Sequence, residues 1–184
     1  MTELKEIPSQ TAGPYVHIGC VPTFAGLTGM YGGVDLGAKM ITGTPEGERI
    51  ELSFELFDGA GEVLKDALIE IWQAGPDGTF GPTTGFTHWG RQPTNADTGI
   101  ATFETLKPAA SGDQAPHVLV WIVARGINLG LSTRVYFPNE DNSKDPVFQL
   151  AADRSSTLVA EKTPRGYHHT CVLRGENETV FFDV

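Results

Sequence analysis

The stretch IELSFELFDGAG, residues 50–61, gives the clearest indication of the fold class. In its first part Ile50, Leu52, Phe54 and Leu56 are separated by polar residues, which places the apolar side chains on one face of a β-strand. The DGAG that follows is a turn signal, because Asp and Gly readily adopt the backbone conformations of tight turns. A half-buried strand that ends at a turn is typical of an antiparallel sheet with one face on a core.

Similar strand candidates recur along the chain, and turn-forming residues separate them. The 22 glycines and 12 prolines are spread over the 184 residues instead of forming one linker, as in folds built from many short strands. Only 145–162 suggests helix, and no repeat or second domain is visible. We therefore predict one domain over 1–184, an all-β antiparallel β-sandwich with long loops at 21–49 and 75–98 and little helix. The strand candidates are 50–57, 64–73, 99–106, 117–124, 132–137, 167–174 and 178–184.

Composition excludes several classes of function. The formal net charge is −10, which argues against nucleic acid as a partner because phosphate binding needs a basic face. No apolar run is long enough to cross a bilayer, and the N-terminus lacks the basic-then-apolar pattern of a secretory signal. We expect a cytoplasmic protein with no membrane partner. Cys20 and Cys171 lie far apart without a CxxC motif, so two free thiols are predicted, with a disulfide between them as the minor alternative.

Metal ligands on a strand are expected at i and i+2, because alternate side chains share a face. His117 has Leu119 at i+2, and the adjacent His168 and His169 would point to opposite faces of a regular strand. The favoured interpretation of His117 is a hydrogen-bonded core histidine. Two Tyr–His pairs do have the spacing and leave a ferric iron site as the minor alternative: Tyr15 with His17, and Tyr167 with His169.

Arg125 ends the apolar run that begins at His117 and is followed by Gly126. A guanidinium at such a place needs an anionic partner if it is partly buried. The carboxylate of a ligand and a structural salt bridge explain it equally well. Nucleophilic catalysis is not indicated, since the sequence has no GxSxG, no Cys–His signature and no phosphate-binding glycine loop. The segment SQTAGPYVHIG, 9–19, favours a bent, exposed backbone that could reach a neighbouring chain.

Several stretches together resemble the alpha chains of the intradiol ring-cleavage dioxygenase family, over a region from Pro8 to the C-terminus. They are PSQTAGPYVHIG, LIEIWQA, the GR…KP segment at 90–108, APH, ARGIN, TRVYF and GENETVFFD. The resemblance implies a prealbumin-like β-sandwich and an (alpha-beta)n oligomer with a homologous beta chain. It also implies that the beta chain holds Fe(III) through two tyrosines and a His-x-His pair, with a tyrosinate-to-iron colour. The implied reaction, part of aromatic catabolism, uses O2 to open protocatechuate (3,4-dihydroxybenzoate) to 3-carboxy-cis,cis-muconate.

The sequence departs from the family's iron-binding pattern. His117 matches the first His of the His-x-His pair, but Leu119 stands where the second would be. The loop 109–114 has no Tyr, and the shorter segment 79–90 offers only Phe80, Phe86 and Trp89 where the other Tyr is expected. The resemblance therefore implies that His117 is the remnant of a lost ligand pair. We expect no metal ligand and no catalytic residue in this chain alone.

By the same resemblance, part of the active site lies at the contact between the two chains. Residues 1–20 are expected to form an extended N-terminal arm at the partner interface, and Arg125 to lie near the substrate carboxylate. The arm residues expected to line the substrate pocket are Thr11, Gly13, Pro14 and Tyr15. Three alternatives remain: a purely structural subunit, a free-standing prealbumin-like binding module, and a self-sufficient catechol dioxygenase. The missing ligands disfavour the last of these.

Overall fold

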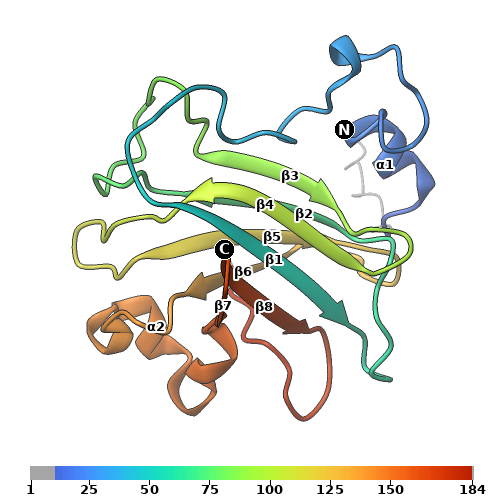
Figure 1. The fold of residues 1–184 in the computed structure, drawn as a ribbon. Coiled ribbons are helices and arrows are strands. Elements are labelled where there is room, and N and C mark those ends of the chain that lie inside the picture. The colour runs from blue at the N-terminus through green and yellow to red at the C-terminus, as the bar shows by residue number, and fades with distance from the viewer. Residues whose placement is uncertain (1–10, 184) are drawn as a thin grey trace, which may run out of the picture.

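The computed structural model describes residues 11–183 and shows two four-stranded β-sheets packed face to face (Figure 1). The first sheet has the strand order β4-β1-β8-β7 and the second has the order β3-β2-β5-β6. The strands are β1 (Arg49–Phe57), β2 (Leu68–Gln73), β3 (Trp89–Pro93), β4 (Ile100–Leu106), β5 (His117–Val123), β6 (Leu131–Tyr136), β7 (Glu161–Thr163) and β8 (Gly166–Val172). The helical segments are α1 (Pro14–Cys20), α2 (Pro146–Leu150) and the 3-10 turns η1 (Tyr31–Gly33), η2 (Asn142–Lys144) and η3 (Ala152–Leu158). The all-β sandwich with little helix is confirmed.

Strand β1 supplies the centre of the core. Its apolar side chains are buried at every second position, as the alternation in its sequence predicts. Phe54 is fully buried and meets the ring edge of Phe103 on β4 at a centroid distance of 5.7 Å. Ile71 of β2 and Ile122 of β5 belong to the same cluster, so both sheets close on one apolar interior.

One strand pair differs from the antiparallel expectation. β1 and β8 run parallel, with Phe54 beside His169 in the register, whereas the other strand pairs of the described residues are antiparallel. A parallel neighbour requires a long connection, and between β1 and β8 the chain forms strands β2 to β7 together with η2, α2 and η3. Alternation within a strand does not reveal the direction of its neighbour, so the sequence pattern could not predict this pair.

Three local predictions need correction. The expected loop 75–98 contains β3, a short edge strand that ends at Pro93, where a missing N–H costs little. The expected strand 178–184 is not a regular strand over its described residues, because its pairing with the sheet is a single bridge between Phe182 and Ser132. The helical region 145–162 is divided into α2, η3 and the first residues of β7.

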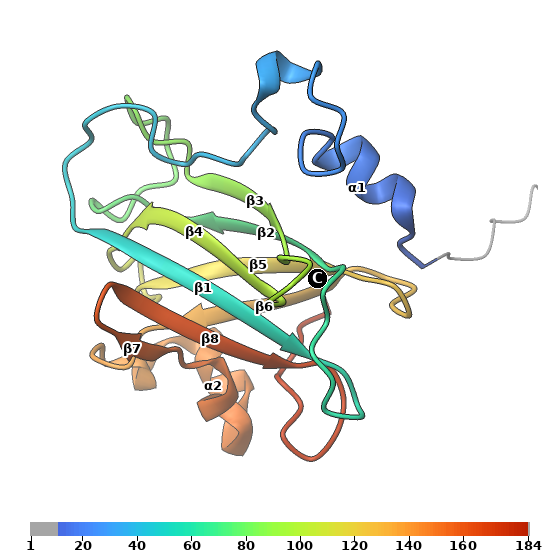
Figure 2. The same cartoon turned by 45° about the vertical axis from the view of Figure 1, so that its right-hand side comes forward.

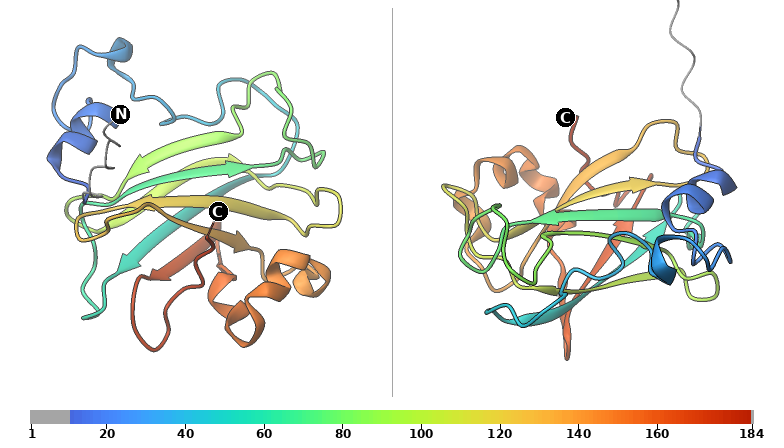
Figure 3. Two further views of the ribbon diagram at one scale, coloured as in Figure 1. Left: turned by 180° about the vertical axis from the view of Figure 1, so that it is seen from behind. Right: turned by 90° about the horizontal axis from the view of Figure 1, so that it is seen from above.

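The N-terminal segment is also only partly as expected. Residues 1–10 of the predicted extended arm lie outside the described residues, and 14–20 form helix α1. Pro14 occupies the start of the helix, where a fixed φ and a missing N–H are both tolerated, so the extended conformation is wrong for this part. Arg91 Nη1 donates to the Cys20 carbonyl at 3.3 Å and ties the end of α1 to β3. Figure 2 shows α1 outside the sandwich, and Figure 3 shows α1 and α2 at opposite ends of it.

Two smaller expectations concern the thiols and the membrane. Cys20 and Cys171 are both free, as predicted, and burial raises the pKa of the Cys171 thiol to about 12. Among residues 11–183, no helix combines the length and the hydropathy that a membrane span needs.

Candidate functional site

Thr11 joins the N-terminal segment to the turn that follows β5. Its hydroxyl accepts a hydrogen bond from the Gly126 amide at 2.6 Å and donates one to the Ala124 carbonyl at 3.3 Å. The two partners of the first bond are 115 positions apart in the chain. Thr11 is thereby held next to Arg125, so the structure brings together two of the residues expected in the substrate pocket.

The turn itself presents Arg125 at its tip. The Ile127 amide donates to the Ala124 carbonyl at 3.2 Å, and Gly126 has a φ of +84°, which favours glycine at this position. With the backbone reversed in this way, the Arg125 side chain leaves the apolar strand and is 80% exposed. This placement explains why a charge can follow such an apolar run without the cost of burying it.

Arg125 has a protein partner in this chain. Its Nε lies 2.9 Å from Oδ2 of Asp66, whose side chain is 38% exposed. The contact joins one guanidinium nitrogen to one carboxylate oxygen, whereas the strongest Arg–carboxylate pairs use two parallel hydrogen bonds. An ion pair as exposed as this one contributes little to stability. The salt-bridge interpretation of Arg125 is therefore present in the structure, and it leaves the guanidinium open to a second anion.

The remaining arm residues lie at the start of α1. Gly13 is the N-cap, and its carbonyl accepts a hydrogen bond from the Val16 amide at 3.0 Å. Pro14 follows as the first residue of the helix, and Tyr15 projects from it with 84% of its surface exposed. Neither Gly13 nor Tyr15 is needed for the core of this chain, and both are accessible to a partner or ligand.

The segment from α1 to residue 36 carries a large exposed apolar surface. Isolated exposed apolar residues are ordinary, but a concentration of them marks an interaction surface. Leu129 is 69% exposed and lies in the loop that Thr11 contacts, four residues after Arg125, so this loop adds another exposed apolar side chain. We call residues 15–36 with Leu129 the N-terminal apolar surface. Its exposed large residues are Tyr15, Ile18, Phe24, Leu27, Met30, Tyr31, Val34, Leu36 and Leu129.

Sequence reasoning did not find this surface. Glycines interrupt the apolar residues of 21–36, so they show neither the period of a helix nor that of a strand. The only signal was the number of large apolar residues in a segment that was expected to be loop. The segment is shaped locally by Asp35, which accepts hydrogen bonds from the amides of Thr23 at 2.7 Å and Phe24 at 3.0 Å.

His117 is a core histidine. It is 4% exposed, its Nδ1 donates to the Ala115 carbonyl at 2.8 Å, and its ring lies 5.8 Å from that of Tyr136. Burial lowers the pKa of the imidazole, so the neutral form is favoured. The favoured interpretation from the sequence agrees with this geometry, and Leu119 lies on the same face of β5 without any metal-binding atom.

The two Tyr–His pairs do not form an iron site. Tyr15 and His17 lie on a helix, where residues two apart do not share a face. Tyr167 and His169 do share a face of β8, but that face is buried in the core, where the Tyr167 hydroxyl donates to Asn139 at 3.1 Å. Over residues 11–183, no three His, Cys, Asp or Glu side chains lie together as a metal site would require. As placed among the described residues, neither Tyr–His pair presents two donor atoms to one ion.

The other two histidines have ordinary partners. Nδ1 of His168 lies 2.8 Å from the Ser53 hydroxyl on the outer face of the first sheet, so His168 and His169 point to opposite faces as predicted. His88 is buried, with Nδ1 3.2 Å from the Gln73 carbonyl and Nε2 2.9 Å from the Thr83 hydroxyl. Neither presents a free nitrogen to a neighbouring carboxylate or thiol.

Comparison with known proteins identifies the relatives of this chain. It is 37% identical over 197 residues to the protocatechuate 3,4-dioxygenase alpha chain of Pseudomonas putida, covering 98% of this chain and 97% of the relative. It is 38% identical to the alpha chain of Burkholderia cepacia, with both chains covered completely. The chain belongs to the protocatechuate 3,4-dioxygenase alpha-chain family. No family model matches the sequence.

The alpha-chain family is related to its beta chains. The protocatechuate 3,4-dioxygenase beta chain of Burkholderia cepacia is 29% identical, over 82% of this chain and 78% of its own length. The dioxygenase domain of a carbohydrate-binding fusion protein from Streptomyces sp. SirexAA-E superimposes with a TM-score of 0.55 at 27% identity, covering 73% of this chain and 84% of that one. An intradiol ring-cleavage dioxygenase from Tetranychus urticae shares the fold, with a TM-score of 0.60 at 18% identity over 72% of this chain and 83% of that one. The family is thus built on the intradiol dioxygenase fold, with homologous alpha and beta chains.

Proposed function

We propose that this chain is the alpha subunit of an enzyme that cleaves protocatechuate with O2 between the two hydroxyl-bearing carbons, giving 3-carboxy-cis,cis-muconate. Its full-length relatives carry the name of that enzyme. The observation that carries the proposal is the hydrogen bond between Thr11 and Gly126, which places the N-terminal segment beside Arg125 on an exposed surface. Together these residues form half of a site that a partner chain would complete.

Arg125 is proposed to bind the substrate carboxylate. Its side chain is exposed and held by a single contact to Asp66, so a ligand carboxylate can approach the guanidinium from solvent. A two-point contact would favour protocatechuate over catechol, which has no carboxylate. The Gly13 and Pro14 backbone, together with Thr11, can approach a flat aromatic ring closely, and Tyr15 would lie beside it.

The ferric iron is proposed to lie in the homologous beta chain. The imidazole of His117 is turned to a backbone carbonyl and Leu119 has no donor atom, so we assign no iron ligand to this chain. The N-terminal apolar surface is proposed as the contact with the beta chain, because its exposed residues need a partner to cover them. The two free thiols fit a reducing, cytoplasmic location.

Iron content and visible absorbance test this division of labour. The chain is purified alone and after co-expression with a homologous beta chain, and each sample is assayed for iron, colour and ring cleavage. We expect all three only in the co-expressed sample. Iron and activity in the chain alone would contradict the assignment of the metal to the partner. Two folded chains that do not co-purify would favour a free-standing binding module.

A purely structural subunit is the second candidate, and the Arg125–Asp66 ion pair favours it. Kinetics of Arg125→Ala in the assembled enzyme separate the two functions. We expect kcat/KM for protocatechuate to fall about tenfold or more, as when a charged hydrogen bond is lost. Arg154→Ala is a matched control, because Arg154 is a half-exposed arginine that also pairs with an acid, Glu178 at 3.8 Å. Unchanged KM and kcat in Arg125→Ala would support the structural subunit.

A further inference from the structure

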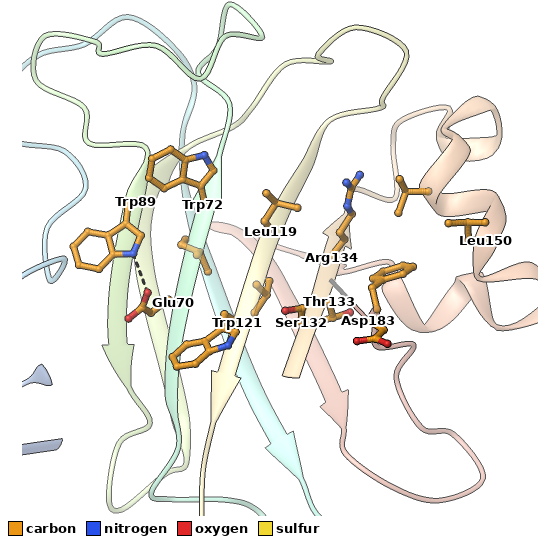
Figure 4. Close-up of a pocket in the computed structure, with 14 residues that line it drawn as sticks. Glu70, Trp72, Trp89, Leu119, Trp121, Ser132, Thr133, Arg134, Leu150 and Asp183 are labelled. Atoms are coloured by element: carbon orange, nitrogen blue, oxygen red, sulfur yellow. Dashed lines mark hydrogen bonds between the residues drawn. The ribbon is translucent and has the colours of Figure 1, made fainter. Parts of the chain in front are cut away.

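The outer face of the second sheet carries a groove of about 870 Å³ that the proposed function does not use (Figure 4). Trp72 of β2, Leu119 and Trp121 of β5, and Leu150 of α2 form its apolar walls. Trp121 and Trp72 are 40% and 43% exposed, so both indole rings are accessible to a ligand in the groove. The volume lies in the range of small-molecule sites.

Arg134 is the cation of this groove. It is half-buried and lies directly opposite Leu119 in the pairing of β5 with β6. Its Nη1 donates to Gln114 Oε1 at 2.8 Å and lies 3.5 Å from the Tyr136 hydroxyl. No carboxylate of the described residues lies within ion-pair distance of it. A partly buried guanidinium with only neutral partners provides a place for an anion.

Neither acidic residue that lines the groove forms an ion pair with Arg134. Glu70 is already paired, with Oε1 accepting from Arg91 Nε at 2.7 Å and Oε2 accepting from Trp89 Nε1 at 3.2 Å. Asp183 is exposed and lies next to Ser132, two positions along β6 from Arg134 (Figure 4). The groove therefore has Arg134 and Asp183 on its β6 side and the indole rings of Trp72 and Trp89 on the side away from α2 (Figure 4).

We propose that this groove binds a small aromatic monocarboxylate, with the carboxylate on Arg134 and the ring against Trp72, Leu119 and Trp121. Aromatic walls with a single guanidinium match a flat anion in both shape and charge. The groove shares no lining residue with the Thr11–Arg125 surface, so it is a second site.

Equilibrium dialysis with labelled benzoate tests the site, using the full chain together with the beta chain that co-purifies with it. Benzoate has no hydroxyls to be cleaved, so the measurement needs no turnover and does not depend on the proposed activity. We expect one benzoate on this chain in addition to any on the partner, with quenching of tryptophan fluorescence. Arg134→Gln should weaken this class of sites about tenfold or more. Benzamide is uncharged, so it should bind the wild type more weakly than benzoate does. Its affinity should be the same for the wild type and for Arg134→Gln.

Two controls keep the result interpretable. Arg165→Gln removes an exposed arginine that pairs with Glu51 on the first sheet, outside the groove, and should leave the benzoate isotherm unchanged. Leu119→Trp fills the groove without removing the cation and should abolish the site, which decides the question if Arg134→Gln folds poorly. An isotherm that neither groove variant alters would overturn the proposal. A second outcome would also overturn the proposal: the wild type binds no additional benzoate, and the groove variants no longer bind the beta chain. That result would identify this face as a contact between subunits.

Discussion

The Thr11 hydroxyl and the Gly126 amide form a 2.6 Å hydrogen bond that closes a separation of 115 residues. The same hydroxyl donates to the Ala124 carbonyl, so one short side chain satisfies both sides of the turn that carries Arg125. Two segments far apart in the sequence are thereby joined at one point. The substrate-facing half-site proposed for this chain depends on that contact.

Thr11→Val tests the bond directly, because valine keeps the shape and removes the hydroxyl. We expect kcat/KM for protocatechuate in the assembled enzyme to fall about two- to tenfold, the usual effect of losing a neutral hydrogen bond. Thr170→Val is the matched control, since Thr170 is an exposed threonine on β8, far from the turn in the sequence. An equal loss in both variants would show that the effect is not specific to the Thr11 contact.

Asp66→Asn should increase the availability of Arg125 to a ligand. The substitution removes a negative charge 2.9 Å from Nε and keeps the size of the side chain. We expect KM for protocatechuate to fall about two- to fivefold, whereas KM for catechol stays unchanged because catechol has no carboxylate. The free energy of unfolding should change by less than about 1 kcal/mol, as for other exposed ion pairs. A rise in KM would mean that Asp66 positions Arg125 and does not compete for it.

Leu129 and Leu150 offer a matched pair for locating the beta-chain contact. They are 69% and 74% exposed, one beside Arg125 and the other on α2 at the opposite end of the sandwich. We expect Leu129→Ser to weaken association with the beta chain about tenfold or more, in line with the burial of one leucine side chain. Leu150→Ser should leave association unchanged. Analytical ultracentrifugation of the mixed chains measures the association of both variants. Weaker association of Leu150→Ser, with Leu129→Ser unchanged, would place the beta-chain contact at the groove.

His169 should make the fold sensitive to acid. It is 2% exposed, both ring nitrogens lack a hydrogen-bond partner, and burial lowers its pKa from 6.5 to about 4. The unfolded chain therefore takes up a proton as the pH falls through 6.5, while the folded chain does so only near pH 4. This contribution to stability is complete above about pH 6.5 and is lost progressively as the pH falls from there to about 4, by about 3 kcal/mol in all. Burial lowers the pKa of His117 as well, which adds a loss of the same sign.

Denaturant unfolding between pH 7 and pH 4 checks this prediction. His169→Leu removes the titrating group and two unpaired buried nitrogens, so its stability should depend less on pH than that of the wild type. His168→Gln alters the neighbouring histidine on the outer face and should retain the slope assigned to His169. If His169→Leu loses stability with acid as steeply as the wild type, other groups must carry the dependence.

The strands were predictable because their information is local. Alternation in 50–57 identifies both the strand and its buried face, and burial at every second residue of β1 agrees with it. Strand β3 was missed because Trp89–Pro93 has no alternating apolar pattern, since the strand lies at an edge of its sheet. The helix α1 was missed because its Gly-Pro start was interpreted as a bend, although proline is also suited to the first position of a helix.

The contact between the candidate site residues could not be predicted from the sequence. Thr11 and Arg125 were chosen from their motifs, and no periodicity could indicate that they would lie together. The groove around Arg134 was not predicted, because its residues come from β2, β3, β5, β6, α2 and the C-terminal segment. Only pairing between strands brings such residues onto one face.

Residue types at short spacing were enough to indicate the class of fold and the family, because both rest on local patterns. The tertiary structure alone decided that β8 runs parallel to β1, that Thr11 supports the Arg125 turn, and that Arg134 faces an aromatic groove without an acid partner. These are contacts between residues far apart in the chain. They are set by the packing of two sheets and by the hydrogen bonds that close their ends, and no local pattern encodes them.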